Sequence, residues 1–120
     1  MIIRHSEEMK TVHMEKMRGG KGTVTVKHIL NPDEMLGKGR LFAENIVPPG
    51  ASIGLHPHHG DTEAYYFIEG KGVYYNNEER FEIEAGDLTV VDDNSQHSVE
   101  NTGEGNMRFI ALILFTEEKK

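Results

Sequence analysis

Cysteine is absent from this chain of 120 residues, and the absence limits the chemistry open to it. Without cysteine the protein can form no disulfide bond and can offer a metal ion no thiolate ligand. The absence also fits a reducing compartment. Any metal bound here must therefore be held by nitrogen and oxygen atoms.

Basic runs and long apolar runs are missing as well. The formal net charge is −7, and the densest basic pair is Lys119 and Lys120, so phosphate-rich nucleic acid is an unsuitable partner. No stretch approaches the roughly 20 apolar residues that span a bilayer, and residues 1–10 lack the apolar centre of a signal peptide. We therefore expect a cytoplasmic protein that binds neither nucleic acid nor membranes.

Short strand-like segments separated by Gly, Pro and Asn make up most of the chain, whose length suits one domain. The expected strands span residues 23–28, 40–47, 52–58, 63–69, 72–76, 80–83, 88–91, 96–100 and 107–115. Residues 74–81 are typical of a hairpin, and Asn31, Pro32 and Glu34 predict a short helical turn. This spacing predicts an all-β sandwich or barrel.

The two ends of the chain raise the question of a partner subunit. Residues 1–20 scatter methionines among charges, and we expect an arm packed on the barrel or on a second subunit, with partial disorder of residues 1–10 as the alternative. Residues 21–120 then form the barrel domain. The strand at 107–115 is apolar on both faces, so its second face must be covered by the arm or by another subunit. A homodimer is therefore expected.

Three histidines and two acids lie within residues 54–63, which read GLHPHHGDTE. Side chains alternate along a strand, so His56 and His58 should share a face, together with Ser52 and Gly54, while Ile53 takes the other. Glu63 begins the next strand, and a hairpin between the two strands can bring its carboxylate close to the two imidazoles. His97 lies far downstream, and spacing alone does not bring it near.

Two segments resemble the motifs of the cupin superfamily, and in particular its small single-domain members. Residues 50–70 place Gly, His-x-His, Glu and Gly at the spacing of the first cupin motif. The second motif is matched at Gly86, His97 and Asn101, but Asp92 and Asn94 stand where Pro and Gly are usual. These two departures concern the backbone of a turn rather than metal ligands.

The resemblance implies a double-stranded β-helix, a jelly-roll-like antiparallel barrel with a metal site in its mouth. It implies that one divalent ion is bound by His56, His58, Glu63 and His97. Three imidazoles and one carboxylate suit Mn, Fe, Co, Ni or Zn, and the ligand types do not choose among these metals.

The other four histidines and Asp61 are not expected to bind the metal. His59 should lie at a turn or rim, and Asp61 should be solvated. His5, His13 and His28 have no partner at ligand spacing and are interpreted as surface or packing residues.

Function follows less directly, because proteins resembling this one include decarboxylases, dioxygenases, isomerases and binding domains. Ile53 stands where oxalate decarboxylases of the family carry a substrate-gripping arginine, and Glu63 argues against thiol dioxygenases. The leading hypothesis is a metal-dependent enzyme acting on a small carboxylate or oxygen-rich metabolite. A non-catalytic binding or sensing protein and a purely structural barrel are the alternatives.

Two further residues are candidates for contact with a small-molecule ligand. Tyr65 should share the face of Glu63 with Phe67 and present a phenol that can donate a hydrogen bond, whereas Tyr66 should pack on the other face. Arg40 could anchor an anion if the face that it shares with Phe42 and Glu44 is inward; otherwise it is an exposed strand-end residue.

Overall fold

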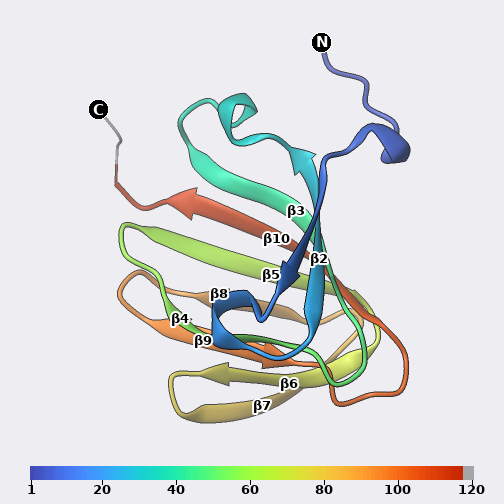
Figure 1. Ribbon diagram of the computed structural model, residues 1–120. Coiled ribbons are helices and arrows are strands. Elements are labelled where there is room, and N and C mark those ends of the chain that lie inside the picture. Colours follow the sequence, from blue (N-terminus) through green and yellow to red (C-terminus); the bar gives the residue numbers. More distant parts are fainter. Residues whose placement is uncertain (118–120) are drawn as a thin grey trace.

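The computed structural model describes residues 1–117 as two antiparallel sheets packed face to face (Figure 1). The larger sheet has the strand order β1-β2-β3-β10-β5-β8, and the smaller has the order β4-β9-β6-β7. The strands are β1 (Thr11–Glu15), β2 (Thr23–Leu30), β3 (Gly39–Val47), β4 (Ser52–Pro57), β5 (Asp61–Glu69), β6 (Lys71–Asn76), β7 (Glu79–Glu84), β8 (Leu88–Val91), β9 (Gln96–Glu100) and β10 (Met107–Phe115). The all-β prediction is confirmed, and the nine expected strands are all present.

Short 3-10 turns are the helical elements of this region: η1 (Ser6–Glu8), η2 (Met17–Gly19) and η3 (Pro32–Glu34). The turn η3 is the one predicted from its capping residues, and the backbone N–H of Asn31 donates to the Glu34 carboxylate at 2.6 Å. No helix among residues 1–117 is long and apolar enough to cross a membrane.

Alternate residues of the facing strands form the core between the two sheets. Tyr65 and Phe67 of β5 and Phe109 of the neighbouring strand β10 are at most 2% exposed and pack ring against ring, and Tyr65 also contacts the ring of Tyr74 on β6 of the smaller sheet. Burying each such side chain contributes about 1.5–3 kcal/mol, so this aromatic layer holds the sheets in a fixed relation. The strands that carry the candidate ligands are thereby positioned.

Strand β4 departs from the strict alternation expected of it. Its pairing with β9 shifts register between Ile53 and His56, which marks a bulge. Ile53 is 1% exposed and belongs to the core, His56 is also buried at 6% exposed, and Leu55 is 49% exposed. The prediction that Ile53 lies on the face opposite to His56 is wrong, because the bulge inserts an extra residue between them.

The N-terminal segment contains a strand that the sequence pattern did not indicate. Strand β1 pairs antiparallel with β2, with Val12 opposite Val26, and extends the larger sheet (Figure 1). The chain then reaches η2, which lies against β4. An arm boundary at residue 20 stays a prediction.

The outer face of β10 remains open in the single chain. Ile110 and Leu112 are half-buried and Leu114 is 41% exposed, beside the outward residues of β5 and β8. Strand β1 lies at the far edge of the sheet, beyond β2, so it does not cover this face. Tyr66 of β5 is 51% exposed here, and the prediction that it packs is wrong for the single chain.

Candidate metal site

Three strands bring the four predicted ligands together. His56 and His97 are directly opposed in the pairing of β4 with β9, His58 follows β4, and Glu63 enters from β5 of the other sheet. All four are buried, with exposed fractions of 6% or less. Burying four polar side chains costs free energy unless hydrogen bonds, an opposite charge or a bound ion compensate for the lost water.

The ligand atoms converge on a common point. The Nε2 atom of His97 lies 3.1 Å from Nε2 of His56, 3.2 Å from Nε2 of His58 and 3.0 Å from Oε1 of Glu63. The same Oε1 lies 3.1 Å from Nε2 of His58 and 3.9 Å from Nε2 of His56. A neutral imidazole carries only one ring hydrogen. Hydrogen bonds among the four side chains therefore cannot account for all of these close contacts.

The opposite ring nitrogen of each histidine is occupied by a separate partner. Nδ1 of His56 donates to the Gly54 carbonyl at 2.7 Å, and Nδ1 of His58 donates to Asp61 Oδ1 at 2.7 Å. Nδ1 of His97 lies 2.8 Å from the Tyr74 hydroxyl. The bonds of His56 and His58 select the tautomer that leaves the Nε2 lone pair free, which is how metal-binding histidines are usually oriented, whereas the Tyr74 hydroxyl can either donate to Nδ1 of His97 or accept from it.

These distances fit a metal ion. Two donors each about 2.1 Å from an ion are roughly 3.0 Å apart in neighbouring octahedral positions and about 4.2 Å apart across the ion. Four of the separations are 3.0–3.2 Å, and the fifth, between His56 and Glu63, is 3.9 Å. The donor set of three imidazole nitrogens and one carboxylate oxygen suits a divalent transition metal.

The electrostatics of the cluster favour an ionised carboxylate. Burial alone raises the pKa of Glu63, but hydrogen bonds with His56, His58 and His97 outweigh it and hold that pKa well below its ordinary value. Burial lowers the pKa of His97. Burial also acts to lower the pKa of His58, but hydrogen bonds with Glu63 and Asp61 raise it overall.

Asp61 is part of this arrangement, and the prediction that it is solvated is wrong. Its side chain is 7% exposed and lies between His58 and Arg40, whose Nε donates to Oδ2 at 2.9 Å. Its burial raises its pKa, but bonds from Arg40 and His58 lower it overall. Asp61 begins β5 two residues before Glu63, so it shares the inward face of that strand, and the alternation of β5 extended by two residues could have indicated this.

Arg40 is therefore engaged in an ion pair. The inward residues of β3 are Ala43, Asn45 and Val47, so the face shared by Arg40, Phe42 and Glu44 is the outer one. Arg40 nevertheless reaches the edge of the cavity described below.

The turn before β9 explains the departure from the family motif. Asn94 has φ +68°, the left-handed conformation for which glycine is usual and which asparagine tolerates. Its N–H donates to the His58 carbonyl at 2.7 Å, and its Oδ1 lies 3.1 Å from Nδ1 of the exposed His59. Asn94 thus takes the backbone conformation for which glycine is usual, and its side chain contacts His59 at the rim.

A cavity of about 200 Å³ opens beside the cluster. His56, His58, Glu63 and Tyr65 contribute to its lining, and six apolar side chains form much of its wall: Val12, Met14, Met17, Val26, Leu41 and Ile113. Burial raises the pKa of Tyr65 well above its ordinary value, with Glu63 adding to the effect, so this phenol stays protonated and can donate.

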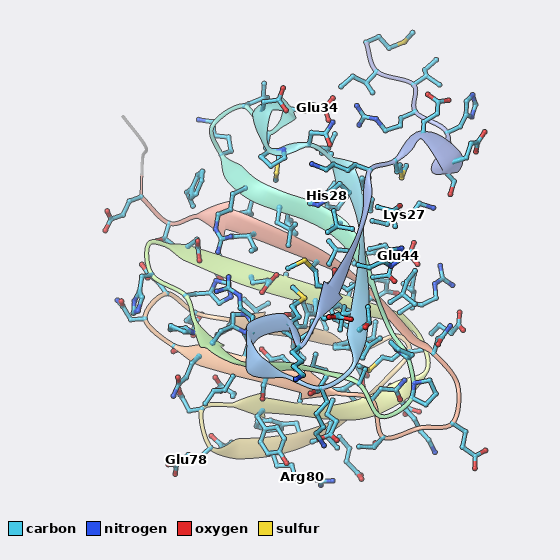
Figure 2. All side chains as sticks on the ribbon, viewed as in Figure 1. Lys27, His28, Glu34, Glu44, Glu78 and Arg80 are labelled. Atoms are coloured by element: carbon cyan, nitrogen blue, oxygen red, sulfur yellow. The ribbon has the colours of Figure 1, made fainter. Side chains whose placement is uncertain are left out.

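Three further polar residues of the cavity were not singled out as site residues by the sequence: Arg18, His28 and Asn45. The interpretation of His28 as surface or packing is incomplete, because it lines the cavity from β2 and its Nδ1 has no hydrogen-bond partner (Figure 2). Asn45 is 1% exposed, and its Oδ1 is likewise unpartnered. Alternation of side chains along β3 places Asn45 on the inward face. This alternation is the feature of the sequence that could have indicated Asn45 as a cavity residue.

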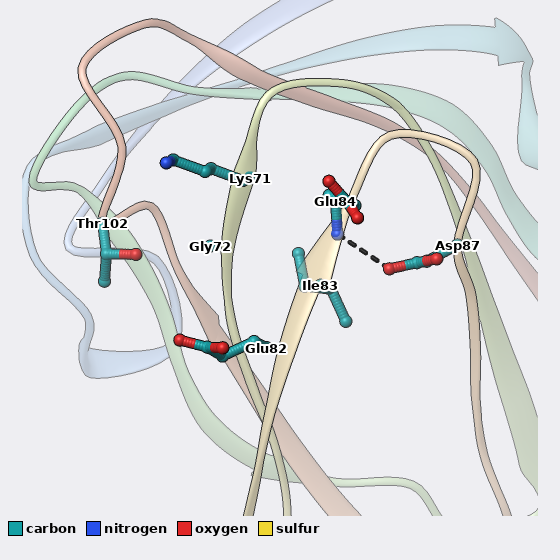
Figure 3. A pocket seen from close by; sticks show the side chains of 7 residues that line it. All are labelled: Lys71, Gly72, Glu82, Ile83, Glu84, Asp87 and Thr102. Carbon is teal, nitrogen blue, oxygen red and sulfur yellow. Dashed lines mark hydrogen bonds between the residues drawn. The ribbon is translucent and has the colours of Figure 1, made fainter.

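A second hollow of about 340 Å³ lies over β6 and β7 and shares no lining residue with the cluster (Figure 3). Its acidic side chains include Glu82, Glu84 and Asp87, and the Glu84 N–H donates to Asp87 at 2.8 Å. None of the buried unpartnered side-chain atoms of residues 1–117 belongs to its lining. We therefore assign no ligand to it.

Two stacked antiparallel sheets around a buried three-histidine, one-glutamate cluster define a double-stranded β-helix with a candidate metal centre. A model of the cupin domain matches residues 43–113. The chain belongs to the cupin family.

Solved and curated proteins agree with this assignment. The chain is 43% identical over 114 residues to an oxalate-binding protein of Thermotoga maritima, covering 95% of this chain and 93% of the relative. A Thermotoga maritima structure described as a predicted oxalate decarboxylase superimposes with a TM-score of 0.90 at 43% identity, over 96% of this chain and 99% of that one. A Photorhabdus luminescens protein shares the fold, with a TM-score of 0.71 at 23% identity over 98% and 89% of the two chains.

Proposed function

We propose that this cupin binds one divalent transition metal through His56, His58, Glu63 and His97 and takes a small carboxylate or oxygen-rich metabolite into the adjoining cavity. The observation that carries the proposal is the convergence of three Nε2 atoms and one carboxylate oxygen, with each Nδ1 held by a separate partner. A metal bound there supplies a Lewis acid with positions left for a chelating acid.

Oxalate is the first ligand to test. A relative with 43% identity is named an oxalate-binding protein, and the cavity of about 200 Å³ suits a ligand of few atoms. Tyr65, whose hydroxyl bonds with Glu63, lines the cavity together with apolar side chains that limit contact of such a ligand with water.

The leading function is that of a metal-dependent enzyme of the decarboxylase, dioxygenase or isomerase type. The second candidate is a non-catalytic binding or sensing protein. The relative's name speaks of binding, and Glu63, the one carboxylate that lines the cavity, is also a proposed metal ligand, which favours this second candidate. Conversion of oxalate by the metal-loaded protein supports the enzyme, whereas tight binding with unchanged oxalate supports the binding protein.

The metal site is tested by elemental analysis of protein purified without chelators. We expect about one Mn, Fe, Co, Ni or Zn per chain, at least about 100-fold weaker metal affinity in His97→Ala, and no loss in His59→Ala, which removes a rim imidazole. Absence of metal from the wild type after reconstitution contradicts the proposal, and so does loss of metal from His59→Ala alone.

We also propose that two copies associate through the open outer face of β10, β5 and β8. Five large apolar side chains on this face are each at least 38% exposed: Tyr66, Ile68, Leu88, Val90 and Leu114. An exposed apolar sheet face of this kind is typical of a subunit interface, and β1 lies too far along the sheet to cover it.

A further inference from the structure

The side of His97 that faces away from the other ligands contacts a residue that neither cupin motif contains. Nδ1 of His97 lies 2.8 Å from the hydroxyl of Tyr74, which belongs to β6. Both residues are at most 4% exposed, and their ring centroids are 5.5 Å apart. Tyr74 lies between the motif segments at residues 50–70 and 86–101. A candidate metal ligand is therefore held from behind by a group that the motifs do not specify.

Metal binding requires one particular direction of this hydrogen bond. A neutral imidazole carries its hydrogen on one nitrogen, and a metal takes the lone pair of the other. Binding through Nε2 of His97 therefore needs the hydrogen on Nδ1, with the Tyr74 oxygen as its acceptor. If Tyr74 donates instead, the ring hydrogen lies on Nε2 and points at the other ligands. The orientation of one hydroxyl group thus determines whether neutral His97 can bind a metal.

Two neighbours of His97 favour the tautomer that cannot bind a metal. The Glu63 carboxylate, 3.0 Å from Nε2, can accept a hydrogen there, and the Tyr74 hydroxyl satisfies its own hydrogen by donating to Nδ1. A buried hydroxyl hydrogen without an acceptor costs free energy. The metal-binding tautomer is therefore reached at little cost only if Tyr74 has a second acceptor for its hydrogen.

Thr89 of β8 offers such an acceptor from the opposite sheet. It lies directly opposite Tyr65 in the pairing with β5, so both side chains face the core. The Tyr65 ring in turn contacts the rings of Tyr74 and His97, at centroid distances of 6.2 and 4.9 Å. Thr89 Oγ1 is buried and completes no hydrogen bond within residues 1–117, although the Thr89 side chain lies against the Tyr74 hydroxyl. A threonine hydroxyl both accepts and donates, and its hydrogen rotates to suit its neighbours.

Tyr74 and Thr89 also line a common cavity of about 380 Å³, the β7–β8 cavity, which lies between β6 and β7 of the smaller sheet and β8 of the larger. It shares no lining residue with the cavity beside the cluster. The other buried unpartnered side-chain atoms of residues 1–117, in His28 and Asn45, belong to that first cavity. Thr89 Oγ1 is therefore the unpartnered atom on the Tyr74 side of His97, and its own hydrogen can be donated to water in the β7–β8 cavity.

We propose that Tyr74 and Thr89 are positioning residues of the metal site. Thr89 Oγ1 accepts the hydrogen of the Tyr74 hydroxyl, the Tyr74 oxygen accepts from Nδ1 of His97, and the Nε2 lone pair stays free for the metal. The inference rests on the proposed function, because only a bound metal needs that lone pair. Neither hydroxyl contacts the metal, and both act through the tautomer and orientation of His97.

Chelator competition for Zn²⁺ tests this relay, at an alkaline pH where the imidazoles are neutral. Thr89→Val removes the hydroxyl and keeps the β-branched shape, and Thr89→Ser restores the hydroxyl. Tyr75→Phe is the matched control for Tyr74→Phe, because Tyr75 is the next residue of β6, faces the other way and is half-buried. Proton NMR of the Zn²⁺-loaded protein adds a second readout, the exchange of the Tyr74 hydroxyl hydrogen with water.

We expect Thr89→Val to weaken Zn²⁺ binding about tenfold and Tyr74→Phe to weaken it at least as much, whereas Thr89→Ser and Tyr75→Phe should bind like the wild type. Exchange of the Tyr74 hydroxyl hydrogen should be slow in the wild type and faster in Thr89→Val. Because Thr89 acts through Tyr74, the double variant should bind no more weakly than Tyr74→Phe alone. A role in packing would instead give additive losses.

Zn²⁺ binding by Thr89→Val within about twofold of the wild type overturns the inference and leaves the proposed function standing. Additive losses in the double variant overturn it as well, because they assign both side chains to packing. If Tyr74→Phe fails to fold, as urea unfolding would show, the two Thr89 variants decide alone. A wild type that takes up no metal overturns the proposed function itself, and the relay with it.

Discussion

Asp61 is the residue that most changes the interpretation of the histidine-rich segment. Its two carboxylate oxygens bond separately, Oδ1 with Nδ1 of His58 and Oδ2 with Nε of Arg40. It thus orients a proposed ligand and is itself held by a cation. Residues with this role are often as important to metal affinity as the ligands they orient.

Metal affinity should fall on acidification earlier than an ordinary histidine would predict. Metal binding needs neutral imidazoles, and the pKa of His58 is raised, so protons begin to compete at a higher pH. Asp61→Asn removes one cause of this rise. In the variant, the pH at which the affinity falls to half of its high-pH plateau should be lower, whereas the plateau affinity itself should be about 10–100-fold weaker because His58 is less well oriented.

Chelator competition across pH checks both effects. Asp33→Asn, at an exposed position of η3, is the control and should match the wild type. An unmoved midpoint in Asp61→Asn would show that Asp61 does not control the protonation of His58.

At the scale of elements, the bulge of β4 and the segment that includes η2 act together. The bulge lets both Ile53 and His56 face inward, while Gly54 faces the backbone of Arg18. One strand thereby supplies a core residue and a residue of the candidate metal-binding cluster, and it also contacts the segment that lines the cavity.

Gly54→Ala should separate these two elements. The added Cβ would lie 2.1 Å from the Arg18 carbonyl oxygen, so the backbone must shift, and we expect the free energy of unfolding to fall by about 1–3 kcal/mol. Urea unfolding measures this change. Gly105→Ala is the control, because no atom lies within 4 Å of a Cβ there. An equal fall in the free energy of unfolding in the two variants would refute the idea that Gly54 is needed for the close contact between β4 and Arg18.

At the scale of the whole molecule, the outer face of the larger sheet is the proposed interface between two copies. Tyr66 and Leu88 are neighbours across β5 and β8, and both are more than half exposed. Charges border this face, where Arg108 pairs with Glu44 at 2.6 Å and with Glu69 at 2.8 Å. Apolar surface within a charged margin is the usual composition of a subunit interface.

Light scattering after size exclusion should give twice the 13.5 kDa of one chain. Tyr66→Glu places a charge at the proposed interface and should yield monomers. Phe81→Glu changes an aromatic residue of similar exposure, 44%, on the other sheet, and should leave the dimer intact. A monomeric wild type at micromolar concentration would refute the dimer.

Much of the fold was predictable because its signals are local. Alternation of period two and turn residues located nine of the ten strands, and β8, β9 and β10 have the predicted bounds. Strand β1 was missed because Thr11–Glu15 is an edge strand with mostly exposed side chains, so burial imposes little pattern on it.

The amino-acid sequence by itself determined the cupin motifs, the all-β fold and a donor set limited to nitrogen and oxygen, since each follows from residue type and spacing along the chain. Only the tertiary structure decided that His97 meets His56, that Asp61 is buried, and that Arg18 and Asn45 line one cavity. The physical reason is that strand pairing joins residues some 40 positions apart, and a single bulge changes which face a side chain takes.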